Sequence, residues 1–411
     1  MSDNVKKKPD IRFEGFVDDW EELRLGELSG NTFGGGTPKT SIPEYWEGTI
    51  PWIQSSDLIT DELFNIVPNK YITDVAVKDS ATKLVPANSI AIVTRVGVGK
   101  IAFMPFQYTT SQDFLSLSNL NIDNIFSMFS IYRILQKELN NIQGTSIKGI
   151  TKPDLLAKII SVPIKIEEQK KIGIFFKQLD TVITLHQQKL ELLKKTKKGY
   201  LQKMFPKNGE TVPEIRFEGF SGEWEQGQLK DILNISKEKN KSEKYSREQV
   251  LSVSREAGTV NQIEYQGRSF AGANISGYKV VKPNQMIYTK SPLKGAPYGI
   301  FQKVTVEGIV SPLYAVYDST EKALASFISL QLKDDNLATH YLSPLVSKGA
   351  KNTINITDEG ALMGKVYYPS KSEQSEIVDF FSKYDIALSQ QQKQLELLKS
   401  LKKSLLQKMF I

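Results

Sequence analysis

Three pairs of matching segments occur in the same order along this chain, and they restrict it to two related halves. In chain order, "PDIRFEGFVDDWEE" from Pro9 matches "PEIRFEGFSGEWEQ" from Pro213, "ITKPDLLAKIISVP" from Ile150 matches "ITDEGALMGKVYYP" from Ile356, and "KLELLKKTKKGYLQKMF" from Lys189 matches "QLELLKSLKKSLLQKMF" from Gln394. A repeat of this kind indicates tandem duplication of one structural unit. Between the matches, residues 30–145 and 235–350 share only a loose rhythm of short β-rich runs and turns.

The third pair of segments ends two long heptad patterns. Apolar residues recur there at alternating spacings of four and three over about five heptads, which is typical of a coiled coil. The predicted seam, which includes one polar residue in each copy, is Ile172, Phe176, Leu179, Ile183, His186, Leu190, Leu193, Tyr200 and Met204 in the first copy, and Ile377, Phe381, Tyr384, Leu388, Gln391, Leu395, Leu398, Leu405 and Met409 in the second. Pro163 and Pro369 mark the helix starts, and neither pattern contains an internal proline.

Polar residues interrupt the seam at the same two positions in both copies. One position holds His186 and Gln391, which we expect to pack against each other near the middle of an antiparallel pair. The other holds Lys197 and Lys402, which either fix the register of the helices or lie where the seam reaches solvent.

Length and composition favour two globular domains without metal or disulfide chemistry. A chain of 411 residues can bury two cores. The absence of cysteine excludes disulfides and thiolate zinc sites. There is no apolar run of membrane-spanning length and no secretory signal at the start, so we expect a cytoplasmic protein.

Positive charge is concentrated in the heptad segments. Residues 165–204 hold ten lysines against four acidic residues, and residues 370–410 hold seven against five. These two segments together carry a charge of +8 and the rest of the chain carries −1, which gives the net charge of +7. The rest of the chain is therefore close to neutral. Any contact of the globular regions with nucleic acid must therefore come from local clusters.

The predicted fold is α+β, with two globular domains of short strands and helices. Two long helices join them and pair as an intramolecular antiparallel coiled coil with pseudo-two-fold symmetry. The predicted boundaries are 1–163 for the first globular domain with its N-terminal frame segment, 164–206 for the first helix, 207–369 for the second globular domain and 370–411 for the second helix. A helix of about 40 residues is a rod of about 60 Å, long enough to separate two DNA-reading domains by more than one helical turn of DNA.

The sequence lacks the motifs of methyltransferases and nucleotide-binding enzymes. No Asn-Pro-Pro loop for a flipped base occurs, and "RVGVGKIA" from Arg95 lacks the glycine spacing and hydroxyl of a phosphate-binding loop. The nuclease-like spacing of Asp154, Glu168 and Lys170 is a chance pattern at a helix start, and His340 is expected on a helix face without a chemical role. The sequence predicts neither a catalytic residue nor a metal site.

The stretch "GGGTPKTSIPEYWEGTIPWIQSSDL" from Gly34 resembles the first target-recognition domain of type I restriction–modification specificity subunits. The residues that carry the resemblance are Gly36, Thr37, Pro38, Tyr45, Trp46, Gly48, Ile50, Pro51 and Trp52. The run "GIVSPLY" from Gly308, the helix openings at Glu167 and Glu373, and the half-repeats resemble the same family. The second globular domain lacks the "TPK…YW…IPW" string and is of another subtype.

This resemblance implies a subunit that recognises a DNA sequence and catalyses no reaction. Each globular domain would read one half of a bipartite DNA target, and the helix pair would set the spacer and dock two modification subunits. Those partners would carry S-adenosylmethionine, and two restriction subunits using ATP and Mg could join them. The chain itself would bind no cofactor and no membrane.

Loop residues with donors, acceptors or positive charge are the candidates for contact with double-stranded DNA. They are Thr37, Lys39, Gln54, Ser55, Ser56, Asp57, Arg95, Lys100 and Gln112 in the first domain, and Ser254, Arg255, Lys290, Ser291, Lys294 and Lys348 in the second. Trp46 and Trp52 are expected to be core aromatics. Two alternatives stay open: an interaction protein whose coiled coil joins two ligand-binding modules, and a stand-alone nuclease.

Overall fold

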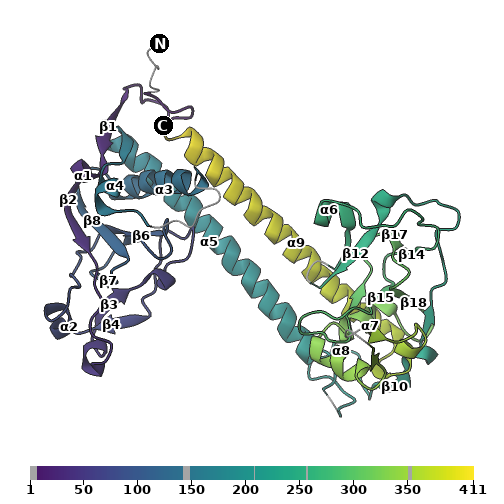
Figure 1. Ribbon diagram of the computed structural model, residues 1–411. Coiled ribbons are helices and arrows are strands. Elements are labelled where there is room, and N and C mark those ends of the chain that lie inside the picture. The colour runs from purple at the N-terminus through teal and green to yellow at the C-terminus, as the bar shows by residue number, and fades with distance from the viewer. Residues whose placement is uncertain (1–6, 142–148, 208, 256–257, 350–353) are drawn as a thin grey trace. The chain divides into compact units, whose positions relative to one another are not determined.

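The computed structural model describes residues 7–141, 149–207, 209–255, 258–349 and 354–411, which form two compact units. Unit 1 comprises Met1–Lys189 and Gln391–Ile411, and unit 2 comprises Leu190–Gln390 (Figure 1). Each unit therefore combines one globular domain with segments of both long helices.

A four-stranded antiparallel sheet forms the centre of unit 1, with strand order β2-β8-β5-β6. Central strand β5 is buried along its whole length, which fits its run of apolar residues 90–93. Smaller sheets pair β1 with β9 and order β4-β3-β7. The elements are β1 (Trp20–Arg24), α1 (Leu25–Leu28), β2 (Ser29–Gly34), β3 (Ile50–Ile53), β4 (Lys70–Ile72), α2 (Asp74–Lys78), β5 (Ser89–Val93), β6 (Ile101–Met104), β7 (Thr109–Thr110), β8 (Phe114–Leu120), α3 (Asn124–Asn141), α4 (Lys152–Leu156), β9 (Ile159–Pro163) and the first part of α5 (Ile166–Lys203).

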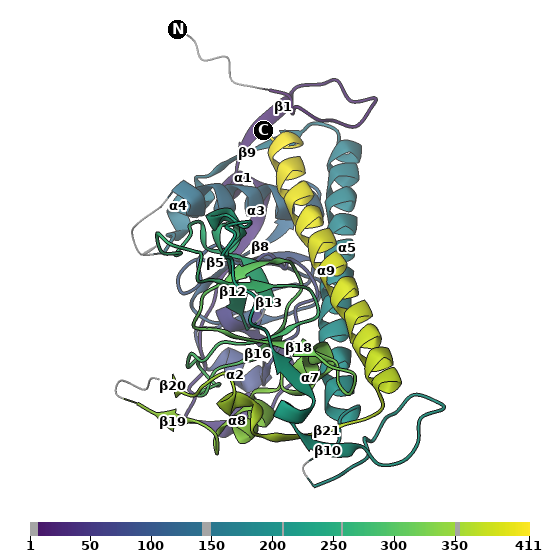
Figure 2. The same cartoon turned by 90° about the vertical axis from the view of Figure 1, so that its right-hand side faces the viewer.

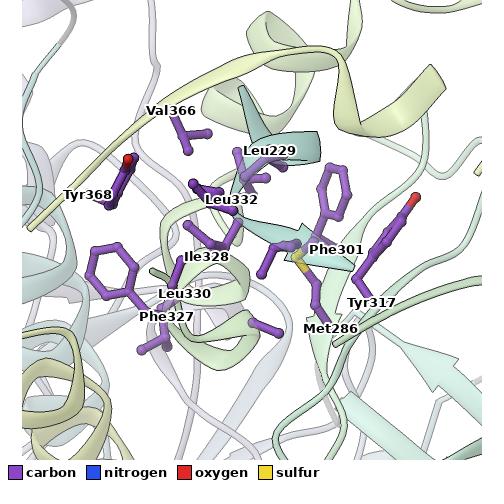
Figure 3. Close-up of a cluster of buried hydrophobic side chains, with 14 of the residues drawn as sticks. Leu229, Met286, Phe301, Tyr317, Phe327, Ile328, Leu330, Leu332, Val366 and Tyr368 are labelled. Carbon is purple, nitrogen blue, oxygen red and sulfur yellow. The ribbon is translucent and has the colours of Figure 1, made fainter. Parts of the chain in front are cut away.

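A four-stranded sheet of order β11-β18-β15-β16 forms the centre of unit 2. Its elements are β10 (Glu225–Gln228), β11 (Leu233–Ile235), β12 (Leu251–Ser254), β13 (Gly258–Asn261), α6 (Gln262–Gln266), β14 (Lys279–Val281), β15 (Met286–Tyr288), β16 (Phe301–Lys303), β17 (Gly308–Val310), β18 (Ala315–Ser319), α7 (Ala325–Gln331), α8 (Asp335–Leu342), β19 (Ser347–Lys348), β20 (Ile354–Asn355), β21 (Lys365–Tyr368) and the first part of α9 (Lys371–Lys408). Figure 3 shows side chains of its core, including Met286 of β15, Phe301 of β16 and Phe327 of α7.

The duplication extends into the regions whose sequences have diverged. Strands β2, β8, β5 and β6 occupy the same positions in their sheet as β11, β18, β15 and β16. The antiparallel pair β1 and β9 likewise corresponds to β10 and β21. Both halves thus have one frame, although residues 30–145 and 235–350 share only a loose rhythm in sequence.

An ion pair in each unit explains why two distant sequence segments are repeated together. Arg12 of the first "IRFEGF" donates from Nε and Nη2 to the buried Glu168 at 2.7 and 2.8 Å. Arg216 of the second copy makes the same two-pronged contact with Glu373, at 2.7 Å for both bonds. Each pair ties the N-terminal segment of its half to the start of a long helix.

A glutamine beside each of these glutamates fixes the start of the helix to the globular domain. Gln169 Nε2 donates to the Pro163 carbonyl at 2.8 Å, and its Oε1 accepts from the Asp123 amide at 2.9 Å. Gln374 repeats both contacts, with the Pro369 carbonyl and the Leu324 amide, each at 2.8 Å. The amides of Asp123 and Leu324 stand at the starts of α3 and α7, where backbone N–H groups have no partner within the helix, so these bonds satisfy them.

The heptad patterns form α5 and α9, each of 38 residues without interruption. Within unit 1 the two helix segments lie side by side in opposite directions (Figures 1 and 2). There Phe176 near the start of α5 packs on Phe410 just after the end of α9, with ring centroids 5.6 Å apart. Every seam position named above is buried or half-buried.

The repeated "QKMF" ends of the helices enter the cores of the globular domains. Phe205 lies edge-on to Trp224 in unit 2, with ring centroids 6.0 Å apart. Phe410 lies edge-on to Trp20 in unit 1, at 6.3 Å. In each unit the C-terminal end of a long helix thus packs on the tryptophan that follows the "RFEGF" segment. The repeated segments "QKMF" and "RFEGF" are therefore repeated together because they belong to one contact region.

Candidate nucleic-acid interface

Loops from several strands of unit 1 meet where β2, β3, β5 and β7 end. The Thr37 hydroxyl donates to Gln112 Oε1 at 2.6 Å, and the Gly36 amide donates to the Thr110 carbonyl at 2.8 Å. The Ser111 amide in turn bonds the Ile53 carbonyl, just before Gln54, at 2.9 Å. Candidate residues 75 positions apart in sequence therefore lie side by side.

The hairpin between β5 and β6 joins the same cluster of loops. Lys100 Nζ donates to the carbonyl oxygens of Ser55 and Leu58 at 2.9 and 2.7 Å. A Cβ built on Gly97 would lie 3.7 Å from Ser55 Cβ. Arg95 and Ser56 are exposed beside these contacts. We call the converging segments 34–39, 54–57, 94–100 and 110–113 the recognition loops of unit 1.

Two candidates in these loops have structural contacts. Asp57 is buried; its Oδ2 accepts from the Gln54 amide at 2.9 Å and its Oδ1 from Asn69 Nδ2 at 2.8 Å. Lys100 is half-buried and bound to carbonyls as described above. These two side chains shape the loops, whereas Lys39, Ser56 and Arg95 present polar groups to solvent, as does the exposed pair of Thr37 and Gln112, which are bonded to each other.

The family-like motif of unit 1 is a packed cluster. Trp52 is buried and its Nε1 donates to the Gly36 carbonyl at 3.0 Å, while Trp46 lies edge-on to it at a centroid distance of 5.0 Å. A Cβ on Gly36 would come within 2.4 Å of the Thr82 amide, so close backbone packing requires glycine there. Both tryptophans thus hold the loop that carries Thr37 and Lys39.

The candidate residues of unit 2 fall into two groups. In the first, Arg255 forms a 2.9 Å ion pair with Asp335, and Gln302 Nε2 donates to the carbonyls of Ser254 and Arg255 at 3.3 and 2.9 Å. The turn that carries Lys294 lies next to this group, because a Cβ on Gly295 would be 3.2 Å from Arg255 Nη1. Ser291 and Lys294 are exposed.

Lys290 belongs to a different arrangement. Its ammonium pairs with Asp358, which also accepts from Lys279 Nζ at 2.6 Å. Burial opposes ionisation of Asp358, but the hydrogen bonds from Lys279 and Lys290 outweigh it and hold its pKa below the ordinary carboxyl value. Lys290 therefore stabilises unit 2. Lys348 lies in β19, and its side chain is outside the described residues.

Reasoning from sequence missed several exposed side chains at these loops. Tyr265 of α6 lies 3.4 Å from the Ser254 hydroxyl, and Phe270 carries the Arg268 guanidinium 4.6 Å above its ring. Val96 and Leu293 are exposed at the tips of the two equivalent hairpins. Apolar residues in turns give no signal in a search for donors and cations.

The two polar positions of the seam are internal contacts. Gln391 Nε2 lies 2.7 Å from His186 Nδ1 and donates to the His186 carbonyl at 3.0 Å, which is the predicted mutual packing. Lys402 pairs with Asp180 at 2.5 Å, and Lys197 pairs with Asp385. Both lysines are buried, so the alternative that they reach solvent is wrong.

The described residues contain no group of three or more His, Asp or Glu side chains that could hold a metal ion. His340 is exposed on α8. Thr151 caps α4 and its hydroxyl donates to Asp154 Oδ2 at 2.6 Å, and Glu168 accepts from Arg12, so both carboxylates of the nuclease-like spacing have structural partners. In the part of the chain that the structure describes, no helix is long and apolar enough to cross a membrane.

Part of the chain is similar in sequence to known proteins. Residues 17–195 match the family model of the type I restriction modification DNA specificity domain. The chain is 29% identical over 242 residues to the type I restriction enzyme MjaIX specificity subunit of Methanocaldococcus jannaschii, covering 54% of this chain and 53% of that protein. It is 35% identical over 185 residues to the EcoR124I/EcoR124II specificity subunit of Escherichia coli, covering 41% and 42%. The chain thus spans about half the length of the curated relatives it matches.

Solved structures extend the likeness to the whole chain. The S subunit of a type I restriction–modification system from M. genitalium superposes with a TM-score of 0.64 at 15% identity, covering 98% of this chain and 99% of that one. A chain from a structure of type I complex assembly gives 0.50 at 16% identity, covering 95% and 97%. At such identities the likeness establishes the fold.

The fold is therefore that of a two-domain protein with a repeated α+β unit and two long helices, as in solved S subunits. Its first half, residues 17–195, belongs to the family of type I restriction–modification DNA specificity domains. The resemblance drawn from the sequence is confirmed.

Proposed function

We propose that this chain is the DNA sequence-specificity subunit of a type I restriction–modification complex. The observation that carries the proposal is the duplicated unit, in which one frame presents a different set of polar loops in each half. Two such domains suit a DNA target in two parts. The family model that matches residues 17–195 is that of a DNA specificity domain, which supports DNA as the ligand. The recognition loops of unit 1 and the group around Arg255 would contact the two half-sites.

The chain would contribute no catalytic step. Its role would be to bind and orient the DNA through loop donors and cations, while two modification subunits supply adenine methylation with S-adenosylmethionine. Restriction subunits using ATP and Mg would join that core, and the complex would work in the cytoplasm. The helix pair would set the number of unread base pairs between the half-sites.

Both long helices offer a surface for the modification subunits on the side opposite the seam. At 100° per residue, Ile174, Leu185 and Leu192 fall within about 20° of one another and roughly opposite Ile183 of the seam. Leu192 is 64% exposed, and Leu397, at the same place in the second repeat, is 61% exposed. Because apolar side chains so placed contribute nothing to the seam, we assign them to partner docking.

Methylation mapping tests the proposal. The chain is expressed with its modification subunit in a host that lacks adenine methylation, and the DNA is read by single-molecule sequencing. A methylated motif in two parts with a fixed gap is the expected result. A soluble complex with a competent methyltransferase but no motif would favour an interaction protein joining two modules. Cleavage of DNA by the chain alone with Mg would favour the nuclease alternative.

A further inference from the structure

The hairpins β5–β6 and β15–β16 occupy the same place in their two sheets, and their tips share an arrangement that the sequences do not reveal. Val96 lies between Arg95 and Gly97 and is 70% exposed. Leu293 precedes Lys294 and Gly295 and is 40% exposed. In both tips an exposed aliphatic side chain stands beside a cation and a left-handed glycine, with φ of 89° at Gly97 and 83° at Gly295.

Hydrogen bonds hold each tip in position. In unit 1, Lys100 binds the hairpin to the carbonyls of Ser55 and Leu58, and the Thr94 amide bonds the Asp113 carbonyl at 2.7 Å. In unit 2, Leu293 and Ala296 exchange two backbone bonds of 3.0 and 2.9 Å across the turn. The aliphatic side chains therefore project from fixed backbones, as a contact surface requires.

The tips do not need these residues for folding. Val96 belongs to none of the buried clusters of the described residues, and a β-branched side chain is not favoured in a turn. The loops 94–100 and 289–300 differ in length, and the cation precedes the aliphatic residue in one tip and follows it in the other. The common frame fixes where the hairpins lie but not which residues stand at their tips, which favours a shared use.

The chemistry of base edges indicates that use. In the major groove they carry hydrogen-bond donors and acceptors and one apolar group, the C5-methyl of thymine. A cation beside the aliphatic group can reach a phosphate or a guanine at the same time. Resting on the proposed function, we infer that Val96 and Leu293 each contact a thymine methyl group, Val96 in the half-site read by unit 1 and Leu293 in the other.

Replacing thymine by deoxyuridine tests this inference, because it removes the methyl group and leaves the base-pair hydrogen bonds intact. Once the motif is mapped, each half-site thymine is replaced in turn, and the dissociation constant of the complex with the modification subunit is measured at fixed salt. We expect about fourfold weaker binding at one thymine in each half-site, the effect of one buried methyl group. Val96→Ala should abolish the sensitivity in one half-site and retain it in the other, and Leu293→Ala should do the reverse.

Val17→Ala is the matched control, since Val17 is also 70% exposed but precedes β1. The inference is overturned if deoxyuridine acts equally on wild type and both variants, or if Val96→Ala weakens assembly with the modification subunit and not DNA binding. Absence of sequence-specific binding by the wild-type complex would instead refute the proposed function.

Discussion

His186 and Gln391 are the same position of the repeat, 205 residues apart, and they contact each other, with Gln391 Nε2 2.7 Å from His186 Nδ1. A residue that touches its own counterpart lies on the local two-fold axis of the helices that carry it. Any shift of one helix along the other separates the pair. The polar contact thus specifies the register, as a polar residue on a coiled-coil seam does.

Replacing both residues by leucine tests that role. His186→Leu with Gln391→Leu should raise the free energy of unfolding by about 1 kcal/mol, because an apolar pair suits the seam better. Gln391→Leu alone should lower it, since it leaves polar groups of His186 without a partner. Urea unfolding of the three proteins measures both effects, and a destabilised double variant would show that the contact contributes more to stability than to register.

The two buried lysines predict an unequal response to one substitution. The side chain of Asp180, which pairs with Lys402, is 11% exposed, whereas that of Asp385, which pairs with Lys197, is 56% exposed. Asp180→Ala leaves a buried ammonium unpaired and should cost about 3 kcal/mol of unfolding free energy. Lys197 is buried as well, but its partner reaches solvent, so water can take the place of the Asp385 carboxylate and Asp385→Ala should cost about 1 kcal/mol or less. Equal losses in urea unfolding would contradict this.

The repeated frame could be predicted from the sequence because its signals are local. Heptad spacing predicts the long helices and the meeting of His186 with Gln391. The repeated "IRFEGF" supplies the arginine of one contact, and "EEQ" in the first half or "SEQ" in the second supplies the glutamate. The pairs are Arg12 with Glu168 and Arg216 with Glu373.

The sites were harder to predict because partners distant in sequence decide which side chains are available. Lys290 looks like a free loop cation until the fold brings Asp358, 68 residues away, against it. Asp57 and Lys100 are likewise engaged by Asn69 and by backbone carbonyls. The common strand order of the two sheets was also hidden, because pairing between strands depends on contacts that spacing alone does not encode.

Asp358 predicts acid sensitivity of unit 2. Lys279 and Lys290 lower its pKa below the value in the unfolded chain, so its contribution to stability is complete above about pH 4 and is lost as pH falls through the folded-state pKa. Asp358→Asn should reduce the melting temperature at pH 7 and flatten its decline between about pH 4 and pH 2. Thermal melts across that range measure it. A parallel decline in both proteins would assign the acid sensitivity to other carboxylates.

The outer faces of the helices predict a defect in assembly. Leu192→Glu and Leu397→Glu place a charge on the proposed docking surface while the seam remains intact. Each should weaken binding of the modification subunit at least tenfold, since a buried unpaired charge is costly at an interface. Ser389→Glu, an exposed position about 80° around α9 from Leu397, adds the same charge and serves as the control. Unaltered affinity in calorimetry with folded variants would move the docking site elsewhere.

Arg95 and Lys39 predict two separable kinds of DNA contact. Arg95 stands on the hairpin tip beside Val96, where a guanidinium can reach a base edge, whereas Lys39 is exposed at the end of segment 34–39. Arg95→Ala should cost about 1–3 kcal/mol of binding and relax specificity in one half-site only. Lys39→Ala should weaken all sequences alike and reduce the salt slope of binding by about 1. Binding titrations at several salt concentrations, with each half-site scrambled in turn, separate these outcomes. Loss of specificity in both half-sites after Arg95→Ala would mean that the two units do not read DNA independently.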